Sequence, residues 1–157
     1  MTDLRARTAG PADIPALIAL EPHTAADVNR QRFLRRCVNA NECYIAERGE
    51  EIVAFGILNY SFFEHGFIAA VIVSESVRYS ETVIALLRYM EGRCRTPKLF
   101  ASARGANTPL QNALRKVQFA ECGSVQNIGV ADEPEFFFYK HLEPDDTKVP
   151  EHRFGLG

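Results

Sequence analysis

Three β-rich runs follow one another directly, and residues 43–73 read CYIAERGEEIVAFGILNYSFFEHGFIAAVIV. The breaks between them, at residues 48–50 and 64–66, are short and carry glycine. Short connections of this kind suit hairpins between neighbouring antiparallel strands. The stretch therefore predicts the second, third and fourth strands of an antiparallel meander.

One strand and two helices are predicted before this meander. Residues 4–8, LRART, alternate in character as a short strand does, and residues 12–20, ADIPALIAL, follow as a helix. We expect Asp13 to be the N-cap, and Pro15 falls in the first turn, where its missing N–H costs little. From Ala25 to Asn39 apolar side chains recur at three- and four-residue steps opposite four arginines, which predicts an amphipathic helix.

Two helices alternate with strands after the meander. The first begins at Ser80 and ends near Gly92, with one apolar stripe formed by Val83, Ile84, Leu87 and Met90. A short strand, KLFASAR, covers residues 98–104. Residues 106–119, ANTPLQNALRKVQF, predict the next helix, with Thr108 as its cap and Pro109 at the first helical position. Strands over residues 119–127 and 135–142 complete a single domain, residues 1–142, and residues 143–157 form a polar tail.

Size, charge and composition restrict the class of protein. The 157 residues suit one core, and a formal charge of −2 gives no field for nucleic acid or an acidic membrane. No apolar run approaches the roughly 20 residues of a membrane helix, and the N-terminus lacks a signal-peptide core, so we expect a cytoplasmic protein. The four cysteines form no C-x-x-C pair, which favours buried free thiols and no metal site. Arginines of residues 30–36 are the single feature that points to nucleic acid, and ordinary solvation of a helix face explains them equally well.

The order β-α-α-β-β-β-α-β-α-β-β over residues 4–142 resembles the GNAT N-acetyltransferase family. Two segments carry the resemblance further. Residues 71–87, VIVSESVRYSETVIALL, fall in register with the family's Arg/Gln-x-x-Gly-x-Gly/Ala turn, where Arg78 matches and Glu81 and Val83 stand at the glycine positions. Residues 107–119 resemble a second pattern, in which Asn107 and Phe119 match. In that pattern the family's tyrosine and glycine are replaced by Leu114 and Gln118.

The resemblance implies a mixed α+β fold, a mostly antiparallel sheet of six to seven strands flanked by about four helices. It also implies acetyl-CoA as the cofactor. The pyrophosphate would lie on backbone amides at a helix N-terminus, Asn107 would steady the pantetheine arm, and strand residues would contact the acetyl-pantetheine arm through their main chain. The residues so implied for cofactor binding are Ile72, Val73, Arg78, Tyr79, Ser80, Glu81, Thr82, Val83 and Asn107.

The replaced glycines bear on phosphate binding, because a glycine lets ligand oxygens approach the backbone without meeting a Cβ. A Glu81 carboxylate facing the pyrophosphate at about 4 Å would oppose each unit charge by roughly 4 kcal/mol at an effective dielectric of about 20. If the side chain turns to solvent, this penalty nearly vanishes. The turn is then read either as a phosphate loop or as a plain helix start.

Candidate catalytic residues stand elsewhere in the chain. Glu64 and His65, at the entry to the fourth strand, are the first candidates for the base that takes the amine proton, although a solvated hairpin explains the same residues. Leu114 cannot protonate a departing thiolate, so other hydroxyl donors are considered: Ser74, Tyr79, Ser80 and Tyr139. Cys43 or Cys122 would need a neighbouring base to act as a nucleophile, and the sequence shows none nearby.

Two functions remain open from the sequence. The first is an N-acetyltransferase that moves the acetyl group of acetyl-CoA to an amine on a small molecule or peptide. The second is a GNAT-fold binding or interaction protein without activity, which Glu81, Val83 and Leu114 together favour. Residues 136–138 predict a strand buried on both faces or covered by a second subunit, hence a homodimer. Glu21, His23 and the arginines of residues 30–36 are the polar groups available to an acceptor.

Overall fold

The computed structural model describes residues 3–77, 79–129 and 132–142, and these form a seven-stranded sheet in the order β1-β2-β3-β4-β5-β7-β6. All neighbouring strands are antiparallel except β4 and β5, which are parallel. This confirms the predicted mixed, mostly antiparallel fold. The strands are β1 (Leu4–Thr8), β2 (Cys43–Arg48), β3 (Glu51–Phe62), β4 (His65–Val73), β5 (Lys98–Arg104), β6 (Ala120–Val125) and β7 (Glu135–His141).

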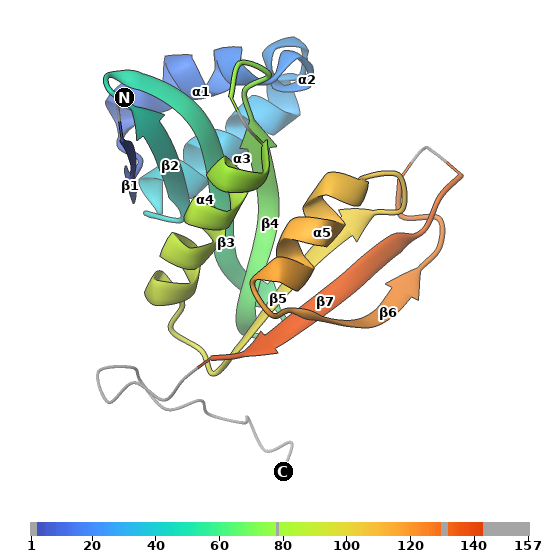
Figure 1. The fold of residues 1–157 in the computed structure, drawn as a ribbon. Coiled ribbons are helices and arrows are strands. Elements are labelled where there is room, and N and C mark those ends of the chain that lie inside the picture. Colours follow the sequence, from blue (N-terminus) through green and yellow to red (C-terminus); the bar gives the residue numbers. More distant parts are fainter. Residues whose placement is uncertain (1–2, 78, 130–131, 143–157) are drawn as a thin grey trace.

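Helices cover the two faces of the sheet unequally. They are α1 (Ile14–Leu20), α2 (Pro22–Ala26), α3 (Val28–Asn39), α4 (Tyr79–Arg93) and α5 (Thr108–Lys116), with one 3₁₀ turn (Pro11–Asp13). Residues of α1 and α3 pack on one face in a core with β2 and β3, and residues of α4 and α5 form the larger core on the other face. Figure 1 shows α1 to α3 gathered over the β1–β4 half of the sheet, whereas α5 lies over β5 and β7.

The single helix predicted from Ala25 to Asn39 is two helices. The chain is extended at Asp27, whose carboxylate accepts hydrogen bonds from the amides of Asn29 and Arg30 and so caps α3. The sequence pattern missed this break because an aspartate can end one helix and begin the next without proline or glycine.

Two predicted caps are also corrected. The Asp13 carboxylate makes no cap bond to α1; it accepts from the Gly10 amide at 2.8 Å and pairs with Arg7 at 2.9 Å. Asn107, and not Thr108, is the N-cap of α5, because its Oδ1 accepts from the Leu110 amide at 3.2 Å. Either residue type caps helices well, so the local sequence did not distinguish them.

The end of α5 explains why a glutamine can replace the family's glycine. Gln118 has a φ of 74°, in the left-handed region, and its amide donates to the carbonyl of Arg115. The next amide, of Phe119, donates to the carbonyl of Leu114, which is the hydrogen bonding of a helix C-terminus that glycine usually serves. The backbone conformation is therefore kept although the residue has changed.

None of the helices in the described ranges is long and apolar enough to cross a membrane.

Candidate active site between the parallel strands

The two parallel strands at the centre of the sheet pair over a short length only. β4 and β5 are in register at Gly66 with Leu99, Phe67 with Phe100 and Ile68 with Ala101. Beyond these pairs β4 stays on β3 as far as Val73, and β5 stays on β7 as far as Arg104. In Figure 1 the two strands run side by side and then separate like the arms of a V. Their facing edges leave backbone groups available to an extended ligand, which could bind as an added strand does.

A β-bulge in β4 lies where the separation begins. The register with β3 steps from Leu58 opposite Ile68 to Ile57 opposite Ala70, so that Ala69 has no partner. Ile68 is also the last residue of β4 that pairs with β5. A bulge bends its strand and increases the local twist, and bulges are common beside active sites. The extra residue at position 69 is therefore the local cause of the V.

Ile72 and Val73, which the resemblance places against the acetyl-pantetheine arm, lie on the separated part of β4. Ile72 packs against the core with α1 and α3, and Val73 packs against the core with α4 and α5. Their side chains thus belong to the two cores, and their main chain is the part that faces the gap.

The helix after β4 begins beside this gap. Arg78 lies outside the described residues, and α4 begins at the next residue, Tyr79. The Glu81 carboxylate is 59% exposed and lies 4.0 Å from Arg48 Nη2, at the end of β2. The Val83 side chain is fully buried in the core. Thr82 is also fully buried, and its Oγ1 has no hydrogen-bond partner among the described residues.

A cleft separates the first turns of α4 from α5. It has a volume of about 350 Å³, and it is lined by Tyr79, Ser80, Thr108, Pro109, Asn112, Ala113 and Lys116. Neither Glu81 nor Val83 is among these residues, because the first turns to β2 and the second to the core. The repulsion that the sequence raised at Glu81 is consequently weak, since a carboxylate in solvent beside an arginine is well screened.

Asn107 and Tyr79 connect the two helices across this region. The side chain of Asn107 lies near the Tyr79 hydroxyl, and its Oδ1 caps α5. Burial raises the pKa of Tyr79, and the Asn107 side chain partly opposes that rise. The phenol is therefore protonated at neutral pH and can donate a hydrogen bond or a proton. Leu114, at the position of the family's tyrosine, is fully buried and has no such group.

The two predicted base candidates lie at the other end of β4. Glu64 has a φ of 67° in the β3–β4 hairpin, and His65 is the first residue of β4. His65 is buried, and its ring centroid lies 5.3 Å from that of Phe100. Ile72 lies seven positions after His65 along the strand, which is roughly 23 Å. Neither residue lines the α4–α5 cleft. Their catalytic role stays a prediction.

The remaining donors and the cysteines are distributed over the molecule. Ser74 Oγ is hydrogen-bonded to Ser76 Oγ, and the ring of Tyr139 stacks on that of Phe100. Burial raises the pKa of Cys43 to about 12, which disfavours a thiolate nucleophile. Cys122 is exposed on β6, and partial desolvation of its thiol, together with the negative charge of Glu121, raises its pKa as well. Of the hydroxyl groups considered from the sequence, Tyr79 and Ser80 line the cleft.

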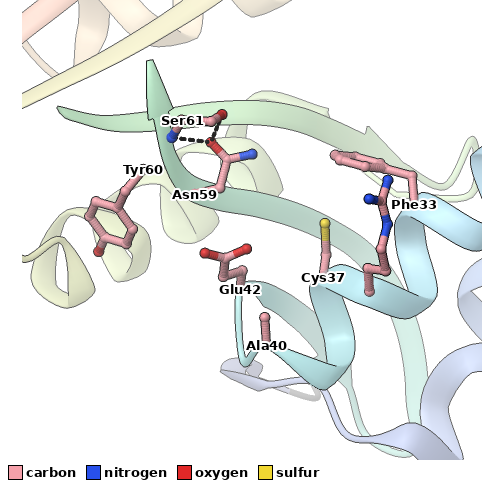
Figure 2. Close-up of a pocket in the computed structure, with 8 residues that line it drawn as sticks. Phe33, Cys37, Ala40, Glu42, Asn59, Tyr60 and Ser61 are labelled. Carbon is pink, nitrogen blue, oxygen red and sulfur yellow. Dashed lines mark hydrogen bonds between the residues drawn. The ribbon is translucent and has the colours of Figure 1, made fainter. Parts of the chain in front are cut away.

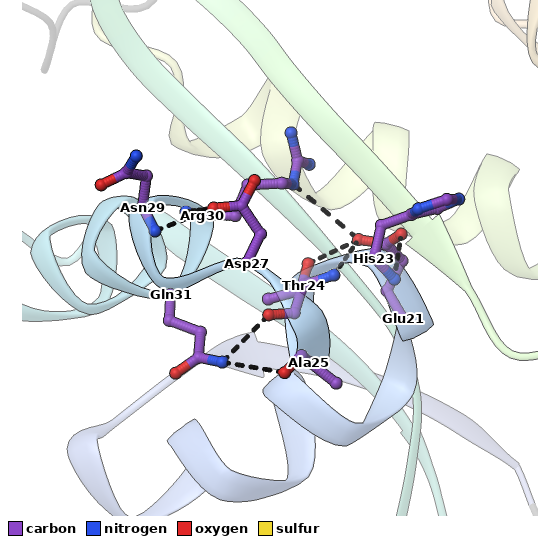
Figure 3. Close-up of polar contacts among 8 residues, drawn as sticks. All are labelled: Glu21, His23, Thr24, Ala25, Asp27, Asn29, Arg30 and Gln31. Carbon is purple, nitrogen blue, oxygen red and sulfur yellow. Dashed lines mark hydrogen bonds and ion pairs between the residues drawn. The ribbon is translucent and has the colours of Figure 1, made fainter.

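The polar groups near α2 are held in a network rather than left available. Figure 3 shows Glu21 accepting from the amides of His23 and Thr24 and from the Thr24 hydroxyl, with Arg30 3.9 Å away. Gln31 donates to the carbonyls of Thr24 and Ala25. Glu21 is therefore the N-cap of α2. Contact of its carboxylate with an acceptor substrate, as expected from the sequence, would compete with these capping hydrogen bonds.

A second hollow lies on the α3 side of the sheet. It has a volume of about 440 Å³ and is lined by Phe33, Arg36, Cys37, Ala40, Glu42, Asn59, Tyr60 and Ser61. Figure 2 shows the Glu42 carboxylate near its centre, and Asn59 bonded to the amide and hydroxyl of Ser61. Asn59 is opposite Phe67, in the paired part of β4, so the hollow lies away from the arms of the V.

The structure thus combines a mostly antiparallel sheet, which opens between two central parallel strands, with a helix that begins beside the gap. No protein-family model matches the sequence, and no curated protein matches it. Solved structures do match. A GNAT-family acetyltransferase from Bacillus cereus is 22% identical, with a TM-score of 0.83, and the match covers 90% of this chain and 99% of that one.

Two further structures agree. Salmonella typhimurium yncA, solved with its cofactor acetyl-CoA, is 14% identical with a TM-score of 0.74, and the match covers 93% of this chain and 98% of that one. The ribosomal-protein-S18-alanine N-acetyltransferase of Escherichia coli is 15% identical with a TM-score of 0.74, covering 94% and 99%. The chain thus has the fold of the GNAT acetyltransferases, as the sequence resemblance implied.

Proposed function

We propose that the protein is an N-acetyltransferase that binds acetyl-CoA in the gap between β4 and β5 and transfers its acetyl group to an amine. The observation that carries this proposal is the restriction of β4–β5 pairing to three residue pairs, next to the α4–α5 cleft. The similarity in fold to yncA, which was solved with acetyl-CoA, supports the choice of cofactor.

Different residues of this chain would contact different parts of acetyl-CoA. The resemblance implies that the pyrophosphate lies on the amides of residues 79–83, and of these the amides of residues 79–81, at the start of α4, lack intrahelical acceptors. Arg78, from the sequence resemblance, would add charge. The main chain of Ile72 and Val73 would flank the acyl arm, and the Asn107–Tyr79 pair would contact it near the cleft.

The reaction itself requires two proton transfers. The amine nitrogen attacks the thioester carbon, a C–N bond forms and the C–S bond breaks, and the amine gives up one proton as the thiolate accepts another. We assign the second transfer to Tyr79, because Leu114 cannot donate and Tyr79 lines the cleft beside Asn107. The acceptor of the amine proton stays open between solvent and the predicted residues Glu64 and His65.

Calorimetric titration with acetyl-CoA, followed by a thiol-release assay with a panel of amines, tests the function. We expect saturable binding and thiol release with at least one amine. Absence of heat at millimolar acetyl-CoA would refute the proposal. Binding without thiol release for any amine would instead favour the GNAT-fold binding protein.

Tyr79→Phe tests the assignment of the proton donor. Loss of a general acid lowers kcat by about 100-fold or more, whereas the affinity for acetyl-CoA should change little because the ring remains. Thr108→Val is the matched control, since it removes a hydroxyl from another residue of the cleft. If the dissociation constant rises and kcat is unchanged, Tyr79 binds the cofactor and does not protonate it.

A further inference from the structure

We propose that the face of the sheet opposite α4 and α5 binds the acceptor, and that stacked aromatic rings on this face select amines that carry an aromatic group. The inference rests on the proposed acetyltransferase function and names its substrate class. The ring cluster consists of Phe62, Phe67, Phe100, Phe137 and Tyr139.

The alternation of side chains along the strands puts these rings on one face. Ile68, Ala101 and Phe138 lie in the core under α4 and α5. Their neighbours Phe67, Phe100 and Phe137 consequently point to the opposite face. All five rings of the cluster are only half-buried. Helices α1 to α3 lie over the β1–β4 half of the sheet, so this part of the face lies beside them (Figure 1).

The rings of Phe62, Phe67 and Phe137 are nearly parallel, and Phe100 joins them at 5.1 Å from Phe62 with a tilt of 51°. Phe62 lies 5.0 Å from Phe67 at 21° and 5.7 Å from Phe137 at 17°, measured between ring centroids and planes. Phe100 and Tyr139 continue the cluster at 6.0 Å and 29°. Offset, nearly parallel rings are a favoured aromatic arrangement, and a flat ligand ring can extend it with a gain beyond simple burial.

The cluster is continuous with the gap between the strands. Phe67 and Phe100 are opposite each other, one pair before β4 and β5 separate, and the bulge at Ala69 follows directly. An acetyl group that enters the gap from the α4–α5 cleft leaves the other face for the amine. The two residues from Phe67 to Ala69 span roughly 7 Å, which matches a linker of two or three carbons between a ring and an amine.

Charge on this face also suits such a ligand. Glu135 precedes Phe137 by two residues on β7, so it lies on the same face, and it takes part in none of the ion pairs recorded between described residues. The half-buried Glu135 carboxylate complements a protonated arylalkylamine, and the guanidinium of Arg104, directly opposite on β5, is neutralised by Glu133 at 3.6 Å. In the transfer, the neutral amine forms the C–N bond, the C–S bond of acetyl-CoA breaks, and the products are an N-acetyl arylalkylamine and CoA.

Direct binding to the protein without cofactor is the first test. 2-Phenylethylamine and n-hexylamine carry the same charge and differ in the ring, and each is titrated by calorimetry. We expect 2-phenylethylamine to bind about 3- to 10-fold more tightly, the range that aromatic stacking provides. The same ratio should appear in kcat/KM when acetyl-CoA is present. Equal affinities would overturn the inference.

Neighbouring phenylalanines of β7 supply matched variants. Phe137→Leu removes a ring from the cluster and should bring the ratio close to one. Phe136→Leu makes the same change on the opposite face, where Phe136 packs against the core, and should keep the ratio.

Sedimentation of both variants tests another occupant of the face that carries Phe137, namely a second copy of the chain. If Phe137→Leu converts a dimer to a monomer and leaves the ratio unchanged, the face is a subunit interface and the inference fails.

The outcomes separate this inference from the proposed function. A preference for the aromatic amine without any binding of acetyl-CoA would keep the ring site and refute the acetyltransferase. Acetylation of both amines at equal efficiency would keep the acetyltransferase and refute the ring site.

Discussion

Two adjacent phenylalanines on β7 lie in different environments. Phe138 is fully buried, among Leu99, Ala101 and residues of α5, and the Arg115 guanidinium stacks over its ring at 5.4 Å. Phe137 points to the other face, where rings lie half-buried and nearly parallel. The covered face is a packed core, whereas the open face retains apolar surface that a ligand or a partner can use.

The two faces of the sheet differ in how much burial they require of their side chains. On the covered face, α4 and α5 bury their side chains and form the cleft assigned to acetyl-CoA. On the open face no such burial is required of the rings, so their positions are available for recognition of an acceptor. The gap between β4 and β5 is an opening that connects the two faces of the sheet.

The largest expected effect separates the two faces directly. Phe138→Ala should lower the free energy of unfolding by about 3–5 kcal/mol, because it removes a fully buried ring and leaves a cavity. Phe137→Ala should cost less than half as much, since part of its ring is already solvated. Urea denaturation of both variants measures the difference. Equal losses would mean that the open face is packed as tightly as the covered one.

A smaller effect is expected from a close approach on the covered face. A Cβ at Gly66 would lie 2.5 Å from Cys94 Sγ and 3.2 Å from Leu99, so Gly66→Ala should destabilise the protein by about 1–3 kcal/mol. Gly92→Ala is the control, because nothing lies within 4 Å of a Cβ there and alanine favours the helix by up to about 1 kcal/mol. Thermal unfolding should therefore shift in opposite directions, and a shift in the same direction would contradict the packing described.

The end of α5 offers a stabilising change. Gln118 has a positive φ, which costs a non-glycine residue about 1 kcal/mol or more. Gln118→Gly should recover close to 1 kcal/mol of stability in urea denaturation, reduced by the greater freedom of glycine in the unfolded chain. A loss of stability would show that the glutamine side chain makes a contact worth more than the strain.

The smallest effect is expected at Glu81. Its carboxylate is exposed and lies near Arg48 on β2, not in the cleft. Glu81→Gln should change stability by less than about 0.5 kcal/mol and the affinity for acetyl-CoA by less than threefold at 0.15 M salt. If the variant binds acetyl-CoA tenfold or more tightly, the Glu81 carboxylate faces the bound phosphates. The first turn of α4 would then be oriented differently in the complex.

Much of the fold follows from the sequence because its signals are local. The meander of residues 43–73, the helix from Tyr79 and the helix after Asn107 are each set by periodicity and by turn residues within a few positions. The missed break at Asp27 and the exchanged caps at residues 107 and 108 are also local, and there two neighbouring residues could perform the same task.

The candidate site was predictable only in part. Register with the family motif pointed to residues 72–83 and to Asn107, and the structure brings Tyr79 and Asn107 together. A separate argument, the need for a base near the entry to the fourth strand, named Glu64 and His65, which lie at the N-terminal end of β4 and whose catalytic role stays a prediction. The alternation of residues predicts which side chains of a strand share a face. It does not predict how many residues of that strand pair with a strand far away in the sequence.

The order of the elements follows from the sequence, and so does the alternation that sends Phe137 and Phe138 to opposite faces, since each depends on residues a few positions apart. Three other features appear only in the folded chain: β4 separates from β5 after Ile68, Glu81 turns to Arg48, and Phe62 contacts rings from three other strands. These features depend on contacts between segments far apart in the chain. Their free energy depends on the packing of the whole sheet, and no local pattern of residues records it.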